Sequence, residues 1–140
     1  MTRFSLLLLA GLMLPLPSWA DTLRGVVVSV ANGDTITILD DSHLQYKIRL
    51  AGIDAPAKGQ GYGSVSKAHL AYLVFQKEVT LVWFKEDRYG RIVGKVMTGG
   101  TDVGLKQVKA GLAWHSKRFQ REQSPEDRMQ YAEAEETARN

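Results

Sequence analysis

The sequence predicts an α+β domain in which a small closed β-barrel of five strands packs beside three helices. Two features favour this class: short strand-like segments joined by tight turns, and helical spacing after the third strand and again at the end. At 140 residues the chain has room for one domain of ordinary size. We therefore divide it into a leader, residues 1–20, and a single domain, residues 21–140.

The first three strands are expected over residues 23–31, 35–39 and 45–50. Asn32-Gly33 separates the first two, and this dipeptide favours a tight hairpin. Over residues 45–50 apolar and polar side chains alternate, so one face should meet the core. The other face, which carries Arg49, should meet solvent or a site.

A helix is expected over residues 64–76, and two more strands over 79–84 and 91–97. The turn Asp87–Gly90 joins the two strands. Apolar side chains recur at helical spacing and predict the buried face of the helix; they are Val65, Ala68, Tyr72 and Phe75.

Two helices complete the chain. Thr101 or Asp102 can cap the first, and Ser124-Pro125-Glu126-Asp127 is a strong start for the second, which should run to Asn140. Its apolar face is thin and consists of Met129, Ala132 and Ala138. An OB-type barrel, with five strands and three helices, fits this order of elements.

The leader has the features of a secretory signal peptide. Arg3 precedes an apolar stretch over residues 4–14, and Ser18-Trp19-Ala20 forms a small-x-small cleavage site before Asp21. The apolar stretch is shorter than the ~20 residues that span a bilayer. We therefore expect a secreted or periplasmic protein that has no stable membrane association after cleavage.

Composition alone does not identify a partner. The chain has no Cys, so it forms no disulfides. Without Arg3 it carries 17 Lys and Arg against 15 Asp and Glu, a net charge of only +2. Residues 85–121 hold nine of the basic residues and three acidic ones, which indicates either a face for a polyanion or an ordinary solvated surface.

Two carboxylates and two guanidiniums lie in separate turns and strands that the fold could bring together. Asp34 follows the first hairpin turn and Asp54 follows the third strand, and such oxygen ligands suit Ca²⁺. Arg49 and Arg91 could grip a phosphodiester. The alternative is that each Asp only forms a turn and each Arg is only solvated.

Four stretches carry a resemblance to a known family of proteins. They are Gly33-Asp34-Thr35, Ile48 to Pro56, Asp87 to Arg91, and Ala110 to Trp114. In this order and at these intervals the chain resembles the thermonuclease, or staphylococcal nuclease-like, family of secreted Ca²⁺-dependent nucleases.

The resemblance implies roles for individual residues. Asp34 and Asp54 match the family's Ca²⁺ carboxylates, and Ala55 falls where a backbone carbonyl completes the metal site. Arg49 and Arg91 match its phosphate-binding arginines. The implied reaction is metal-assisted hydrolysis of DNA or RNA phosphodiester bonds by a monomer.

Ala57 departs from the family pattern, which has a glutamate at this position as the usual general base. A methyl group can neither accept a proton nor hold a water, and we expect no substitute base. Three interpretations remain open: a slow nuclease, a catalytically silent binder, or a lesion in an otherwise ordinary enzyme. The silent binder would be an OB-type module for single-stranded nucleic acid, and binding of oligosaccharide or another anionic polymer by the same barrel surface is a third, weaker option.

Four further side chains are expected to contact nucleic acid, namely Arg88, Tyr89, His115 and Lys117. Tyr89 could stack on a base from the hairpin tip. Trp114 is expected in core or barrel-edge packing.

A second departure concerns the end of the sequence. Members of the family commonly continue past the last helix through a Gly-Leu-Trp segment, and this sequence ends at Asn140. We expect the thin last helix to be poorly held and the melting temperature to be low, below the ~65 °C that bounds the usual mesophile range.

Overall fold

The computed structural model describes residues 21–140. The signal peptide expected over residues 1–20 lies outside the described residues. Within residues 21–140 no helix is both long enough and apolar enough to cross a membrane.

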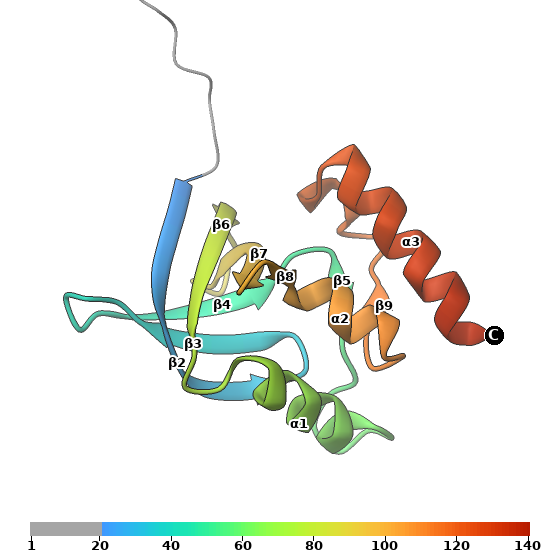
Figure 1. Ribbon diagram of the computed structural model, residues 1–140, viewed down its shortest axis with the longest axis horizontal. Coiled ribbons are helices and arrows are strands. Elements are labelled where there is room, and N and C mark those ends of the chain that lie inside the picture. The colour runs from blue at the N-terminus through green and yellow to red at the C-terminus, as the bar shows by residue number, and fades with distance from the viewer. Residues whose placement is uncertain (1–20) are drawn as a thin grey trace, which may run out of the picture.

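Five strands close into the expected barrel (Figure 1). Antiparallel pairing gives the order β4-β3-β2-β6-β7, and a parallel pairing between β4 and β7 closes the ring. The two-residue strand β8 extends the barrel sheet by pairing with β7, and β5 and β9 form a separate two-stranded sheet. The strands are β2 (Asp21–Asn32), β3 (Thr35–Leu39), β4 (Gln45–Leu50), β5 (Ile53–Asp54), β6 (Glu78–Glu86), β7 (Ile92–Thr98), β8 (Thr101–Asp102) and β9 (Trp114–His115).

The hairpin between β2 and β3 turns at Gly33 and Asp34, one residue later than the Asn32-Gly33 prediction. Asn32 pairs with Thr35 across the ladder, and its side-chain oxygen accepts a hydrogen bond from the Asp34 backbone N–H at 3.0 Å. The Asn side chain therefore stabilises the turn from the strand end, as short polar side chains commonly do.

Three α-helices accompany the barrel: α1 (Gly63–Val74), α2 (Val103–Lys109) and α3 (Pro125–Arg139), with a short 3₁₀ helix, η2 (Gln120–Glu122), before the last. Both expected caps are present. The Asp102 side chain accepts from the Leu105 N–H, and the Ser124 hydroxyl accepts from the Asp127 N–H. Figure 1 shows α1 at the lower end of the barrel and α2 between the barrel and α3.

The predicted buried face of α1 is wrong. The helix buries Gly63, Ser66, Leu70 and Val74, whereas Val65, Tyr72 and Phe75 are exposed. Ser66 is polar, so the apolar spacing misses it, but its hydroxyl donates to the Leu112 carbonyl oxygen at 2.7 Å. A satisfied hydroxyl can lie inside at little cost, and the residues that are buried lie on the opposite side of the helix from the predicted face.

The predicted face of α3 is also wrong. Met129 is 74% exposed, and Ala132 and Ala138 are exposed as well, while Tyr131 and Ala134 are buried against α2. The Tyr131 hydroxyl donates to Asp102 at 2.6 Å, so one amphipathic side chain anchors the helix. This anchor weakens the reason for expecting a loosely held helix, and the low melting temperature stays a prediction.

Candidate active-site cleft

A cleft of about 630 Å³ opens between the β6–β7 hairpin and the segment that precedes α3. It is lined by the four side chains to which the family resemblance assigns metal-binding and phosphate-binding roles: Asp34, Arg49, Asp54 and Arg91. Arg88 and Tyr89, expected to contact nucleic acid, line it too. Its remaining lining residues are Asn32, Lys85, Glu86, Asp87, Val93, Arg118, Phe119 and Glu122.

Close packing at Gly33 sets the position of Asp34. A Cβ atom on Gly33 would lie 1.8 Å from the Ser66 hydroxyl oxygen and 2.8 Å from the Ala55 Cβ, so only glycine fits between α1 and β5. The turn thereby brings Asp34 Oδ2 to the Ala55 backbone N–H, which donates to it at 2.9 Å. Because Ala55 follows Asp54, this bond ties the two carboxylates of the predicted metal site to neighbouring positions.

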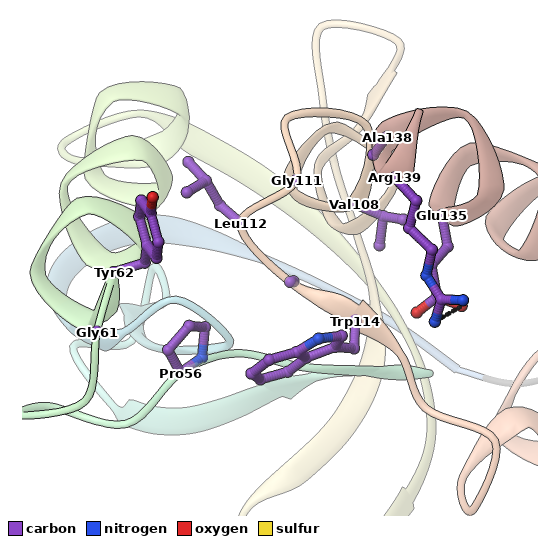
Figure 2. Close-up of a pocket in the computed structure, with 11 residues that line it drawn as sticks. Pro56, Gly61, Tyr62, Val108, Gly111, Leu112, Trp114, Glu135, Ala138 and Arg139 are labelled. Atoms are coloured by element: carbon purple, nitrogen blue, oxygen red, sulfur yellow. Dashed lines mark ion pairs between the residues drawn. The ribbon is translucent and has the colours of Figure 1, made fainter.

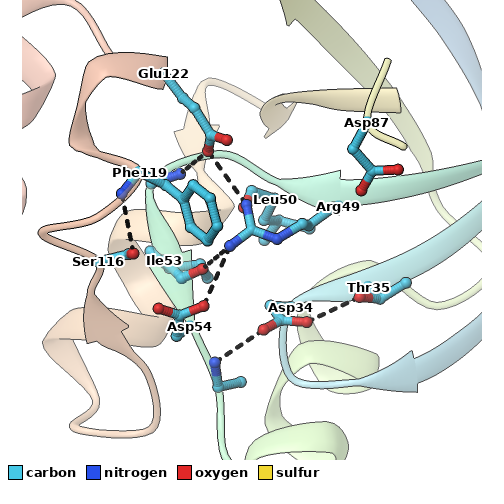
Figure 3. A network of polar contacts seen from close by, with 12 residues as sticks. Asp34, Thr35, Arg49, Leu50, Ile53, Asp54, Asp87, Ser116, Phe119 and Glu122 are labelled. Atoms are coloured by element: carbon cyan, nitrogen blue, oxygen red, sulfur yellow. Dashed lines mark hydrogen bonds and ion pairs between the residues drawn. The ribbon is translucent and has the colours of Figure 1, made fainter. Parts of the chain in front are cut away.

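Arg49 occupies the floor of the cleft and is only 6% exposed, so of the two expected surroundings, solvent or a site, its strand face meets the site. Its Nη2 donates to the Ile53 carbonyl oxygen at 2.9 Å and to Asp54 Oδ1 at 3.2 Å. Its Nη1 donates to Glu122 Oε1 at 3.2 Å. Figure 3 shows the guanidinium between the two carboxylates, with the Phe119 ring beside it. The charge is buried because it is paired on both sides.

Glu122 is the residue that the sequence did not predict. Its side chain is 6% exposed. Its Oε1 also accepts from the Gly52 N–H at 3.0 Å, and its Oε2 lies 3.4 Å from Lys85 Nζ. Nothing in the local sequence marks it, because Arg49 lies 73 residues away along the chain.

The opposite wall is built by the turn between β6 and β7. Asp87 accepts from the backbone N–H groups of Tyr89 and Arg91 and from the Arg91 Nε, the last at 2.8 Å. Burial opposes ionisation of Asp87, but these hydrogen bonds outweigh it and hold the pKa of its carboxyl below the usual range. Asp87 is therefore an ionised group that orients Arg91.

The two Ala positions of the family site lie apart from the cleft lining. Ala57 is exposed on the loop that leads to α1, and Ala55 contributes its N–H to Asp34. Two carboxylates of the cleft, Glu122 and Asp87, are each engaged by an arginine and by backbone N–H groups, whereas the exposed Glu86 also lines the cleft. Both carboxylates are therefore poorly placed to take a proton from water, and the absence of a substitute base stays a prediction.

The donor set fits a hard cation only in part. Asp34 and Asp54 supply carboxylate oxygens, and the Asp54 side chain is 42% exposed. Within residues 21–140 no group of three or more His, Cys, Asp or Glu side chains is suited to a metal ion. Ca²⁺ takes six to eight oxygen ligands, so two carboxylates would need carbonyls, water and substrate oxygens to complete the site.

His115 and Lys117 do not line the cleft, and a contact of either residue with nucleic acid stays a prediction. His115 is 3% exposed, and its Nε2 hydrogen bonds to Gln123 Oε1 at 2.8 Å. Lys117 Nζ contacts His115 Nδ1 at 3.0 Å and Glu135 at 3.1 Å. Burial lowers the pKa of His115, so its neutral form is favoured. These residues join β9 to α3.

A second hollow, of about 180 Å³, lies near the start of α1 and the end of α3 (Figure 2). Pro56, Tyr62, Leu112 and Trp114 line it, with Glu135 and Arg139 at one side. Trp114 is half exposed here, so it does not pack in the core. Pro56 and residues 111–114 of the stretches that carry the family resemblance line this hollow, but Asp34, Arg49, Asp54 and Arg91 do not.

The fold and the cleft together define a class: an OB-type barrel with paired carboxylates and arginines at one mouth. Residues 47–140 match the family described as "Staphylococcal nuclease homologue". The chain therefore belongs to the staphylococcal nuclease family.

Named relatives agree with this assignment. The chain is 42% identical over 93 residues to an "Uncharacterized endonuclease" of Haemophilus influenzae, covering 66% of this chain and 52% of the relative. It is 46% identical over 93 residues to an Escherichia coli protein of the same description, covering 66% and 60%. It is 40% identical over 112 residues to a "Micrococcal nuclease" of Shigella flexneri, covering 74% and 63%. The chain thus spans less than two thirds of the length of each of these relatives.

Proposed function

We propose that this chain is an exported, Ca²⁺-dependent endonuclease that hydrolyses phosphodiester bonds of DNA and RNA as a monomer, slowed by the absence of a glutamate at position 57. One observation carries the proposal. Asp34, Arg49, Asp54 and Arg91 come from four separate turns and strands and line a single cleft. The names of the relatives support the reaction class.

The two arginines would hold the phosphate, Arg49 from the floor of the cleft and Arg91 from the wall built by the β6–β7 turn. The carbonyl oxygens of Leu50 and Ile53 fix the orientation of the Arg49 guanidinium. Asp87 holds the Nε of Arg91 and leaves its terminal nitrogens for an anion. Guanidiniums fixed in advance stabilise charge that develops on a phosphoryl oxygen without reorganisation during attack.

Asp34 and Asp54 would hold the cation, with the Ala55 carbonyl as the third protein ligand that the family resemblance implies. When bound, Ca²⁺ supplies Lewis-acid polarisation and a template for substrate and water. Asp54 also accepts from Arg49, so any ligand that draws on Asp54 leaves an Arg49 N–H for a phosphate oxygen. The carboxylate and the guanidinium are therefore coupled in binding.

A catalytically silent binder of single-stranded nucleic acid is the second candidate. It is favoured by the engagement of Asp34, Asp87 and Glu122 in hydrogen bonds, which leaves them poorly placed to accept a proton. Both candidates share the arginine cleft and differ only in turnover.

The test is Ala57→Glu, with Ala68→Glu as the matched control, because Ala68 is exposed on α1 and adds the same charge elsewhere. Cleavage of single-stranded DNA is measured with excess Ca²⁺ and with EDTA. We expect slow, EDTA-sensitive cleavage by the unmodified protein and a rise of about 100-fold or more for Ala57→Glu alone. Salt-sensitive binding with no cleavage by either protein would favour the silent binder.

A further inference from the structure

The segment before α3 forms the wall of the cleft that faces the β6–β7 turn, and its Phe119 ring contacts two guanidiniums. The Arg49 Cζ lies 4.5 Å from the centroid of the Phe119 ring, and the Arg118 Cζ lies 4.4 Å from the same centroid. Both distances are well inside the range of attraction between a cation and an aromatic face. The ring therefore orients Arg118 as well as Arg49.

The wall built by the β6–β7 turn has the same arrangement of one aromatic ring and two guanidiniums. The Cζ atoms of Arg91 and Arg88 lie 5.5 and 5.6 Å from the Tyr89 ring centroid. Each ring thus contacts one arginine of the family site, Arg49 or Arg91, which we call the inner arginine. It also contacts a second one, Arg118 or Arg88, which we call the outer arginine. Arg88 was expected from the sequence to contact nucleic acid, whereas Arg118 was not.

The inner and outer arginines differ in their counter-charges. Arg91 is paired with Asp87, and Arg49 with Asp54 and Glu122. Across residues 21–140, no carboxylate lies within ion-pair distance of the exposed Arg118, although it lines the cleft. A guanidinium that is oriented but not neutralised leaves positive potential at the mouth, where a polyanion would enter.

We propose that Arg118, supported by Phe119, is a phosphate-binding residue for single-stranded nucleic acid, on the opposite side of the cleft from Arg88. A strand whose phosphate reaches Arg49 would then present a neighbouring phosphate to Arg118. The planar guanidinium can stack on the ring and still direct its N–H groups to phosphate oxygens, which a lysine ammonium cannot do. This inference rests on the proposed function, because it deepens the binding of the same substrate.

Arg121 provides the control. It is an exposed arginine three positions further along the same segment, and it does not line the cleft. Arg118→Ala and Arg121→Ala therefore remove the same charge from almost the same place in the sequence. Arg118→Lys keeps the charge and removes the planar stack.

The experiment measures fluorescence anisotropy of a labelled oligothymidylate of about eight nucleotides, within the usual site size of barrels of this class. EDTA prevents cleavage, and each protein is titrated at several salt concentrations. We expect Arg118→Ala to weaken binding about three- to tenfold at low salt, to lower the slope of log affinity against log salt by about 0.7, and Arg121→Ala to do neither. Arg118→Lys should recover the salt slope but only part of the affinity.

Two results would overturn the proposal while leaving the proposed function intact. Either the Arg118→Ala protein binds as tightly as the unmodified protein, or both Ala variants lose the same affinity, which would indicate a general effect of net charge. If the unmodified protein shows no salt-dependent binding of the oligothymidylate, then the proposed function fails, and this inference fails with it.

Discussion

Replacing Glu122 by Gln tests whether this carboxylate holds the floor of the cleft together. The side chain is nearly inaccessible and joins Arg49, the Gly52 N–H and Lys85. Gln keeps the shape, and its carbonyl can still accept from Gly52. The substitution removes the charge and places an amide donor where Oε2 faces Lys85, and within residues 21–140 Arg49 then keeps one carboxylate partner, Asp54.

The cost can be estimated from the contacts. Removing one partner of a buried ion pair, together with its hydrogen bonds, lowers the unfolding free energy by about 3–5 kcal/mol. Here one backbone hydrogen bond survives, the Lys85 side chain is half exposed, and Asp54 still compensates Arg49. A charge-assisted hydrogen bond is about twice as strong as a neutral one, so the expected loss is roughly 1–3 kcal/mol of unfolding free energy. That corresponds to a melting temperature lower by roughly 4–12 °C.

Urea denaturation followed by circular dichroism measures this loss, and Glu136→Gln on the exposed face of α3 is the control. The control should change the unfolding free energy by less than about 0.5 kcal/mol. Because the Arg49 pair is buried, the effect of Glu122→Gln should persist at high salt, where surface pairs are screened. Equal urea midpoints for the two variants would refute the role that we assign to Glu122.

Two other predictions concern stability. Gly52 has a φ of 76°, and an added Cβ would lie 2.3 Å from the Gln123 side chain. Gly52→Ala should therefore lower the unfolding free energy more than Gly59→Ala, because Gly59 has a φ of 93° but no atom within 4 Å of an added Cβ. Equal urea midpoints for the two variants would contradict this. Burial lowers the pKa of His115 in the folded protein, so its stabilising contribution is complete above its unfolded pKa of about 6.5 and is lost as the pH falls toward the folded pKa. The unfolding free energy should decrease as the pH is lowered from about 7.5 to 5.5. This dependence should be weaker in His115→Gln but not in His43→Gln, where the side chain is exposed.

Much of the fold could be predicted from local sequence. Turn residues, alternation and caps gave the five barrel strands and three helices, usually within two residues of their observed ends. The Ser124 and Asp102 caps are examples, because a cap depends on only three or four consecutive residues. Four motif residues of the cleft could also be identified, since each lies in a short stretch that resembles the family.

The buried faces of helices were less predictable. Apolar spacing on α1 pointed to Val65 and Tyr72, which are exposed, and missed Ser66, which is buried and bonded to Leu112. On α3 it pointed to Met129 and missed Tyr131 as the anchor. Periodicity counts apolar residues, but it does not report which polar groups find a partner from a distant element.

By itself, the sequence determined the order of strands and helices, the family, and the residue types that reach the cleft, because all of these depend on local spacing and short motifs. Only the tertiary structure decided which carboxylates and rings surround the arginines. Glu122 and Phe119 meet Arg49 because barrel closure brings the segment before α3 against β4. Such a meeting depends on the packing of segments some 70 residues apart, and no local pattern encodes that distance.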